Sequence, residues 1–465
     1  MPQTPWSMYQ IKQCEQQLGQ AMLRDEHSLV LYSVDFGKLH SSKPSAVFVP
    51  QSTGDLQDLM RYANEQGLPV TIRAKGLSQG GQTLALEGGV TIHMEQFTQV
   101  YEPQADVIWV DANATWSDLL DATVPLSKIP FVVPYNTNLS VAGLLSIGGV
   151  GAASFREGVA AAHVQALEVV TAEGELLTVD ASSPLFQACL GGQGQFAVIS
   201  KAAIALRPCA KQVRTFSLTY NDKAQWMRDL AQFKQSVDYI ETFCTPALLG
   251  SKLTAKGRTP YAEWLFALHV SVEYDDEAPD LSSLGDDLRP WKVSNCQDES
   301  MASYLHRHDP RFAAMKLSGH WDMHHPWYEC LIPAELLEQE LDNFLEFLPM
   351  YFASNVHVVP IANRHEQTFV ISPDKPEFYC IMILNPGIPP GLLPGCLDAI
   401  NEMDDRLLQA GGKRYMSGFF GENVTDAYWK NHFGARYGTW LDSKQRFDPK
   451  GIFTSILHQN QDIKP

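Results

Sequence analysis

A strand that runs directly into a glycine-rich loop limits the folds open to this chain more than any other feature. Residues 69–97 read PVTIRAKGLSQGGQTLALEGGVTIHMEQF. Gly76, Gly80 and Gly81 carry no Cβ, so they can take positive φ and let backbone N–H groups converge on an anion such as a pyrophosphate. The segment by itself is consistent with such a cradle and with an ordinary glycine-rich hairpin.

Two further glycine-rich segments favour the cradle. Residues 139–158 read LSVAGLLSIGGVGAASFREG, where four glycines between positions 143 and 151 would weaken a helix and therefore indicate backbone close to a flat ligand. Residues 190–204 read LGGQGQFAVISKAAI, a glycine turn followed by a run typical of a buried strand. Three such loops predict one large cofactor that contains a polyphosphate. None has the spacing of the dinucleotide fingerprint or of the nucleotide-triphosphate loop, so we expect a different cofactor fold.

Four segments occur in the order seen in the FAD-linked oxidases of the vanillyl-alcohol oxidase superfamily. They are RAKGLSQGGQ from residue 73, SVAGLLSIGGVG from 140, GGQGQFAVI from 191 and YWKNHFGARYGTWLDSKQRFDP from 428. Within that superfamily the chain most resembles cytokinin dehydrogenase, because DYIETF at 238–243 and HPWYECLIP at 325–333 are similar to that family's D-Y-V-E-G-F and H-P-W-L-N-L-F-V-P segments. The resemblance covers nearly the whole chain and implies an FAD-dependent oxidoreductase.

The resemblance also implies a two-domain α+β fold. A PCMH-type FAD-binding domain would be joined to an α+β substrate-binding domain with an antiparallel sheet. The composition changes around Leu206-Arg207-Pro208, so we expect residues 1–207 and 411–465 to form a split FAD-binding domain and residues 208–410 the other. In the first domain we expect a strand, helix, strand unit whose helix has Thr53 as its N-cap and stops at Gly67.

The same resemblance supplies candidate cofactor contacts, to which Arg73 and Lys75 add positive charge. The expected set is Arg73, Ala74, Lys75, Gly76, Leu77, Ser78 and Gln82 from the first loop, Ser140, Ala142, Gly143, Ser146, Gly149 and Val150 from the second, Ile199 from the strand at the adenine, and Trp327 and Tyr415 near the flavin. For the last two residues, simple core packing is an equally open interpretation.

One departure from the family concerns the attachment of the cofactor. Cytokinin dehydrogenases have G-H-S in the first loop, and the histidine is bonded covalently to the flavin. The corresponding triplet here is Gly76-Leu77-Ser78. A leucine side chain cannot form that bond, so we expect FAD to be bound non-covalently.

A second departure concerns catalysis. The family's W-T-D segment, whose aspartate accepts a hydrogen bond from the substrate amine, corresponds here to Val133-Pro134-Tyr135. A phenol has an unperturbed pKa near ~10 and is a poor base at neutral pH unless positive charge, for which Arg73 and Lys75 are candidates, lowers that pKa. Oxidation of an alcohol or a sugar-like molecule is therefore an alternative to amine oxidation, since other members of the superfamily use a tyrosine as base.

Two further residues are candidates for acid–base work. Glu241 is the carboxylate that we expect in the substrate pocket, with a pKa raised by burial, although a solvated glutamate at the end of an element is also consistent with the sequence. Five histidines lie between His306 and His325, but their spacing fits no metal-ligand motif, so we expect no metal. Among them, His320 is a candidate for the proton acceptor that Tyr135 cannot supply.

Bulk properties limit the partners and the compartment. With 35 basic and 53 acidic residues the formal net charge is −18, which disfavours nucleic acid and anionic membranes. The first twenty residues lack the pattern of a signal peptide, no window approaches a membrane span, and eight scattered cysteines indicate reduced thiols. We expect a cytoplasmic protein that acts on a small-molecule substrate with O2 or a quinone as electron acceptor. Because the plant members of the family that it resembles are mostly secreted, the resemblance implies a bacterial or intracellular relative.

The sequence therefore predicts hydride transfer to FAD from a small amine, with N6-substituted adenines among the candidates. Two alternatives remain open. One is the oxidation of an alcohol or sugar-like substrate. The other is a catalytically silent relative that binds FAD or a cytokinin-like ligand, because two active residues of the family are missing together.

Leu77 leads to the first testable prediction. Acid precipitation of the purified protein should leave all flavin absorbance in the supernatant, because no covalent bond holds the cofactor. Visible spectra of the pellet and supernatant make the measurement. Yellow colour retained in the pellet would contradict it.

Overall fold

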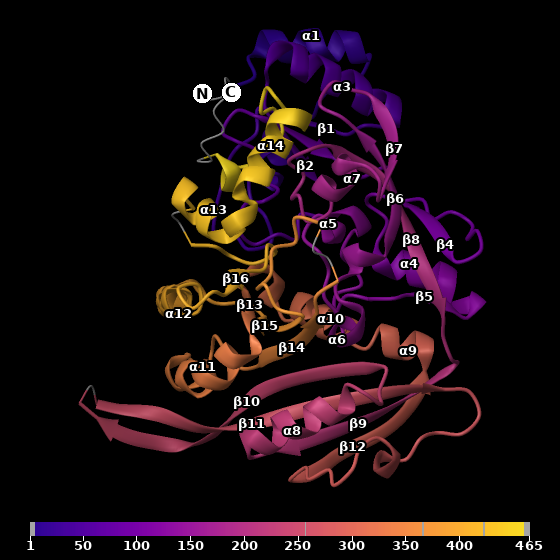
Figure 1. The fold of residues 1–465 in the computed structure, drawn as a ribbon. Coiled ribbons are helices and arrows are strands. Elements are labelled where there is room, and N and C mark those ends of the chain that lie inside the picture. Colours follow the sequence, from indigo (N-terminus) through magenta and orange to yellow (C-terminus); the bar gives the residue numbers. More distant parts are fainter. Residues whose placement is uncertain (1–4, 256, 365–366, 422–423, 460–465) are drawn as a thin grey trace.

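Three β-sheets and the helices that cover them form the described part of the chain (Figure 1). The computed structural model describes residues 5–255, 257–364, 367–421 and 424–459. The helices are α1 (Met8–Leu18), α2 (Glu26–Leu31), α3 (Thr53–Gln66), α4 (Trp116–Thr123), α5 (Val141–Leu145), α6 (Ser154–Glu157), α7 (Pro184–Cys189), α8 (Lys223–Phe233), α9 (Met301–Leu305), α10 (Asp309–Leu317), α11 (Ala334–Phe347), α12 (Leu393–Leu407), α13 (Asp426–Phe433) and α14 (Tyr437–Phe447). Over these ranges, no helix combines the length and the apolar character needed to span a membrane.

The strands fall into a three-stranded, a five-stranded and an eight-stranded sheet. They are β1 (Ala46–Phe48), β2 (Val70–Arg73), β3 (Val90–His93), β4 (Val107–Asp111), β5 (Lys128–Pro130), β6 (Val164–Val170), β7 (Leu176–Asp180), β8 (Val198–Pro208), β9 (Gln212–Tyr220), β10 (Tyr239–Thr254), β11 (Gly257–Tyr274), β12 (Lys292–Ser300), β13 (Tyr328–Pro333), β14 (Val356–Ala362), β15 (Glu377–Ile383) and β16 (Lys413–Arg414).

The first sheet is parallel, in the order β1-β3-β2, and α3 connects β1 to β2. This is the expected strand, helix, strand unit. Ser52 is the N-cap of α3, so the expectation for Thr53 was wrong by one residue. The reason is the position of Asp55, which lies three residues after Ser52 and completes a reciprocal capping box with it. Gly67 ends the helix at φ 65°, as expected.

The second sheet carries the third glycine-rich segment into the core. Its strands are ordered β4-β8-β6-β7, with β5 also paired to β8, and the pairings are antiparallel. β8 follows the turn at residues 191–194 and is almost wholly buried, which confirms the strand expected there. The glycine turn therefore lies at the N-terminal end of β8.

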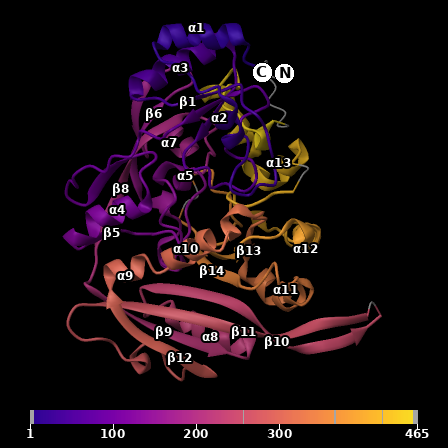
Figure 2. The same ribbon diagram turned by 180° about the vertical axis from the view of Figure 1, so that it is seen from behind.

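The third sheet is antiparallel, in the order β12-β9-β11-β10-β14-β15-β13-β16. α8 packs against β9 and β11, and α11 and α12 pack against β13. One face of this sheet packs in a hydrophobic core of its own. On the other face, residues of β13, β14 and β15 such as Leu331, Val359 and Phe378 join the core of the first two sheets. Figures 1 and 2 both show the β10–β11 hairpin extending beyond the rest of the sheet. The two-domain α+β architecture expected from the sequence is present.

The C-terminal segment returns from the third sheet to the first. β16 is the last strand to pair in the eight-stranded sheet, whereas α13 and α14 pack in the core of the first two sheets (Figure 1). The Val70 N–H donates to the Ile452 carbonyl over 2.8 Å. This return supports our proposal that residues 1–207 and 411–465 form one domain and residues 208–410 the other, with β16 reaching across between them.

A buried ion pair fastens the returning segment. The Lys444 ammonium contacts an Asp448 carboxylate oxygen at 2.7 Å and donates to the carbonyls of Gln195 and Phe453, and the two charged side chains are 1% and 0% exposed. Asp448 also accepts the backbone N–H groups of Ile452 and Phe453. The pair therefore joins α14 to the glycine turn before β8 and to the strand-like segment beside β2.

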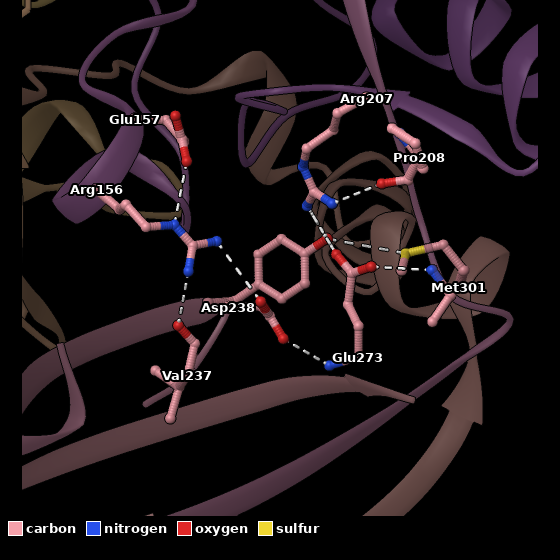
Figure 3. A network of polar contacts seen from close by, with 10 residues as sticks. Arg156, Glu157, Arg207, Pro208, Val237, Asp238, Glu273 and Met301 are labelled. Atoms are coloured by element: carbon pink, nitrogen blue, oxygen red, sulfur yellow. Dashed lines mark hydrogen bonds and ion pairs between the residues drawn. The ribbon is translucent and has the colours of Figure 1, made fainter. Parts of the chain in front are cut away.

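A second polar network joins α6 and β8 to the eight-stranded sheet (Figure 3). Arg156 bonds its neighbour Glu157, donates to the Val237 carbonyl and lies 3.5 Å from the Asp238 carboxylate. On the other side of the network, the Arg207 guanidinium contacts the Glu273 carboxylate at 2.7 Å. These contacts fix the first two sheets against the third, and the cavity described below lies where the two parts meet.

The buried pair leads to a stability prediction. Asp448→Ala should lower the free energy of unfolding by about 3–5 kcal/mol, because it leaves the Lys444 charge buried without its counter-charge. Glu402→Ala is the matched control, since it breaks an exposed i,i+4 pair with Arg406 and should cost under about 1 kcal/mol. Urea denaturation of the wild type and the two variants measures these free energies of unfolding. Equal losses for the two variants would refute the structural role of the pair.

Candidate cofactor and substrate site

One cavity lies between the glycine-rich loops and the eight-stranded sheet. It contains about 1550 Å³ of empty space, a volume that includes open solvent. The predicted residues that line it are Ala74, Lys75, Gly76, Leu77, Ser78, Gln82, Tyr135, Ser140, Ala142, Gly143, Ser146, Val150, Ile199, Trp327 and Tyr415. The fold thus brings together loops separated by more than a hundred positions in the sequence.

The first loop turns around a buried carboxylate. Asp35 is 3% exposed, and one of its oxygens accepts the Gly81 N–H at 2.9 Å and the Ser78 hydroxyl at 3.0 Å. Burial raises the pKa of Asp35 to about 6, although these two hydrogen bonds and the charge of Arg73 act in the opposite direction. Gly76 takes φ 66°, and a Cβ there would lie 2.5 Å from the Arg73 guanidinium. Arg73 therefore supports the loop from beneath and does not line the cavity.

The donor groups of this loop fit a phosphate-bearing cofactor. Among the described residues, no acceptor is found for the backbone N–H groups of Lys75, Gly76, Leu77 and Ser78. Four successive free donors beside a lysine, at the wall of a large cavity, provide the hydrogen bonds and positive potential that an anionic group requires. The loop is not an ordinary hairpin, because the strands β2 and β3 on either side of it pair in parallel, and its free donors support the predicted cradle.

The second segment forms the short helices α5 and α6 with a glycine turn between them, so its backbone is only partly helical. A Cβ at Gly143 would lie 2.6 Å from the Ser140 hydroxyl oxygen. Gly149 lies outside the cavity. It takes φ 88°, packs against Ala160 and Leu144, and donates its N–H to the Tyr415 hydroxyl at 2.7 Å. Its role is to hold Tyr415 against the cavity.

The third segment contributes Gln193, Gly194, Ala197 and Ile199 to the wall. Gln193 takes φ 53°, and neither atom of its buried amide has a partner among the described residues. An amide in that position leaves a donor and an acceptor available to a ligand. Together the three segments fit FAD.

Leu77 lies in an aromatic cluster. It packs with Phe36, Phe312, Trp321 and Trp327, and Phe36 lies 5.4 Å from Trp327 between ring centroids. The described residues that line the cavity include no histidine and no cysteine, so no imidazole or thiol lies there to form a covalent link to the flavin. This composition agrees with the expectation of non-covalent FAD. The end of the cavity at this cluster is aromatic and aliphatic.

Tyr135 lines the cavity, and its buried hydroxyl has no hydrogen-bond partner among the described residues. Burial, and next the negative charge of Glu241, raise the pKa of this phenol well above 10, although Arg307 acts in the opposite direction. The idea that Arg73 or Lys75 activates Tyr135 is therefore wrong. The nearest cation is Arg307, and its effect is too small to offset burial. Tyr135 is a neutral hydroxyl that can donate or accept one hydrogen bond.

Glu241 is held away from the cavity in an ion-pair cluster. Its two oxygens contact Arg307 Nε at 2.8 Å and His308 Nε2 at 2.6 Å. Burial by itself would raise its pKa, but the charges and hydrogen bonds of Arg307 and His308 prevail and hold the pKa well below the usual range. The expected raised pKa was wrong because these two partners were not visible in the sequence. Glu241 is a fixed carboxylate that lies behind Tyr135.

The histidines between residues 306 and 325 do not converge. His306 contacts Asp309, His308 contacts Glu241, and His324 donates from Nδ1 to the Lys38 carbonyl. His320 contacts the Ser318 hydroxyl at 2.6 Å and does not line the cavity, whereas its neighbour Trp321 does. We therefore correct the placement of His320, whose side chain is turned toward its own loop.

Sequence reasoning missed Glu329, Asp35 and Gln193. Glu329 lines the cavity from β13 and is 3% exposed. Burial raises its pKa to about 8, with Arg414 acting in the opposite direction. The sequence did contain a sign of Glu329, because this residue occupies the asparagine position of the family's H-P-W-L-N segment. No local pattern marks Asp35, which lies about forty positions before the loop that it organises.

The geometry of the first loop predicts the effect of adding a side chain. Gly76→Ala should weaken FAD binding about tenfold or more. A residue with a Cβ takes this positive φ only at a cost of about 1–3 kcal/mol, so the loop of the free variant relaxes to another conformation, and FAD binding must restore the original one. Fluorescence titration of the flavin-free protein with FAD measures the effect. Gly67→Ala is the control, because Gly67 has nearly the same φ but open space around it. A loss of affinity in the control, or none at Gly76, would contradict the cradle.

Comparison with known proteins agrees with this site. A family model described as FAD binding domain matches residues 44–180, and a model described as cytokinin dehydrogenase 1, FAD and cytokinin binding, matches residues 210–463. Cytokinin dehydrogenase 9 of Oryza sativa subsp. japonica is 29% identical over 92% of this chain and 88% of its own length, and cytokinin dehydrogenase 1 of Arabidopsis thaliana is 25% identical over 90% and 79%. An oxidoreductase named ORF5 in the fasciation locus of Rhodococcoides fascians is 28% identical over 92% and 96%. The chain therefore belongs to the cytokinin dehydrogenase family of FAD-dependent oxidoreductases.

Proposed function

We propose that the protein oxidises a small amine, with N6-substituted adenines as the leading substrate class, by hydride transfer to non-covalently bound FAD. The observation that carries this proposal is the unpartnered Tyr135 hydroxyl in the wall of a cavity whose adjoining cluster is aromatic. A flat heterocycle with an apolar substituent fits such a cluster. One of its ring nitrogens would accept a hydrogen bond from that hydroxyl.

Each group would have a distinct part in this reaction. FAD, when bound, supplies the oxidant that accepts the hydride. Trp327 is held by its indole N–H, which donates to the Asn385 carbonyl at 2.8 Å, so its ring is fixed as a packing surface for the substrate. Tyr135 donates a hydrogen bond to a ring nitrogen of the substrate and orients it, but its raised pKa excludes it as the base.

Two alternatives remain. An alcohol or sugar-like substrate would use the same Tyr135 hydroxyl, but a sugar needs several polar partners, and the cluster around Trp327 offers few. A catalytically silent FAD- or ligand-binding relative is favoured by the Glu241 ion pairs, which occupy the carboxylate. We further propose a cytoplasmic location, and O2 or a quinone as the electron acceptor.

The test is anaerobic mixing of the FAD-loaded protein with isopentenyladenine, with the flavin absorbance recorded. We expect bleaching of the oxidised flavin, and a rate that falls roughly two- to tenfold in Tyr135→Phe, the range for the loss of one neutral hydrogen bond. Tyr428→Phe is the matched control. Its hydroxyl is also buried and has no partner in the part of the chain that the structure describes, but Tyr428 does not line the cavity.

Three other results would each change the conclusion. Bleaching by alcohols or sugars and not by adenines would replace the substrate class. A spectral shift without bleaching by any donor would favour the silent relative. Equal rates in the Tyr135 and Tyr428 variants would remove Tyr135 from the site.

A further inference from the structure

The loss of an amine proton needs an acceptor, and the candidates discussed so far do not provide one. When a secondary amine is oxidised, the C–H bond gives up a hydride and the N–H bond a proton, and a C=N bond forms. Tyr135 has a phenol pKa far above neutrality, Glu241 is paired with two cations, and His320 lies outside the cavity. The proton must therefore go elsewhere.

Among the described residues that line the cavity, Glu329 is the one with a carboxyl group. It extends from β13 and is 3% exposed. The Ser417 hydroxyl donates to its Oε2, while Oε1 has no hydrogen-bond partner among the described residues. A buried carboxyl with one oxygen held and the other free, on the wall of a ligand cavity, can take up a proton from a bound molecule.

The surroundings of Glu329 keep its charge uncompensated. Arg414 on β16 is the cation nearest to it, but the Arg414 guanidinium donates to Asp404 and to the backbone carbonyls of Glu329 and Phe419, rather than to the Glu329 carboxylate. Tyr415, and Cys380 on the adjacent β15, also face it. Burial raises the pKa of both groups well above the ordinary values, so neither carries charge near neutral pH.

We propose that Glu329 is the catalytic base of this site. Its carboxylate accepts the N–H proton of the amine as the adjacent C–H bond gives its hydride to FAD, and the substrate leaves as a neutral imine. The inference rests on the proposed amine oxidation and identifies the proton acceptor that this reaction requires. Since only the ionised form accepts a proton, the rate rises with pH through the pKa of this group and then levels.

The first experiment follows anaerobic flavin reduction by isopentenyladenine as a function of pH. In the wild type, the rate constant should rise through about pH 8, the pKa of Glu329. Glu329→Gln should remove this limb and slow reduction roughly a hundredfold or more, the usual contribution of a general base. Ser417→Ala should keep the limb but move it to higher pH, because it removes a hydrogen bond that stabilises the carboxylate.

The second experiment does not depend on turnover. The infrared difference spectrum of the FAD-loaded protein across the same pH range should contain the carbonyl band of a protonated carboxyl group, and Glu329→Gln should lack it. Flavin reduction whose pH limb survives in Glu329→Gln overturns the inference and leaves the proposed function intact. If isopentenyladenine never reduces the wild-type flavin, the proposed function fails and the role of Glu329 as its base fails with it.

Discussion

The hydrogen bonds between Asp35 and the first glycine loop are the interaction on which the rest of the site depends. One buried carboxylate oxygen holds both Gly81 and Ser78, and Arg73 occupies the space beneath Gly76. This arrangement forces the loop to turn its backbone donors toward the cavity instead of toward its own strands. Because the loop also contacts the C-terminal segment through Gln82, whose amide donates to the carbonyls of Met416, Ser417 and Gly418, the cofactor wall and the Glu329 wall are built as one unit.

The unit is built where the first two sheets meet one face of the third sheet, whose other face has a core of its own. Lys444 and Asp448 fasten the C-terminal helix to the first core, and the Arg207–Glu273 pair fastens β8 to the third sheet. Both pairs lie away from the cavity lining. Their contribution is to fix the distance between the glycine loops and β13, so that a flat cofactor and a flat substrate can share one opening.

The sequence predicted the parts of this structure that depend on local backbone requirements. The positive φ of Gly76 and Gly81, the buried strand β8 and the antiparallel third sheet all follow from residue patterns or from the family resemblance. It did not predict the side-chain partners. Glu241 was assigned a raised pKa because Arg307 and His308, more than sixty positions away, were not known to lie beside it. His320 was placed in the site because it lies just before His325-Pro326-Trp327, and Arg73 because it lies beside the first glycine loop. Neither side chain lines the cavity, whereas their neighbours Trp321 and Lys75 do.

The most direct measurement is a crystal structure of the FAD-loaded protein. The account predicts FAD in the cavity against Gly76 to Ser78, with a break in electron density between Leu77 and the flavin and with Glu329 open to the remaining space. Flavin bound outside this cavity, or a Glu329 side chain that is covered by protein in the complex, would contradict it.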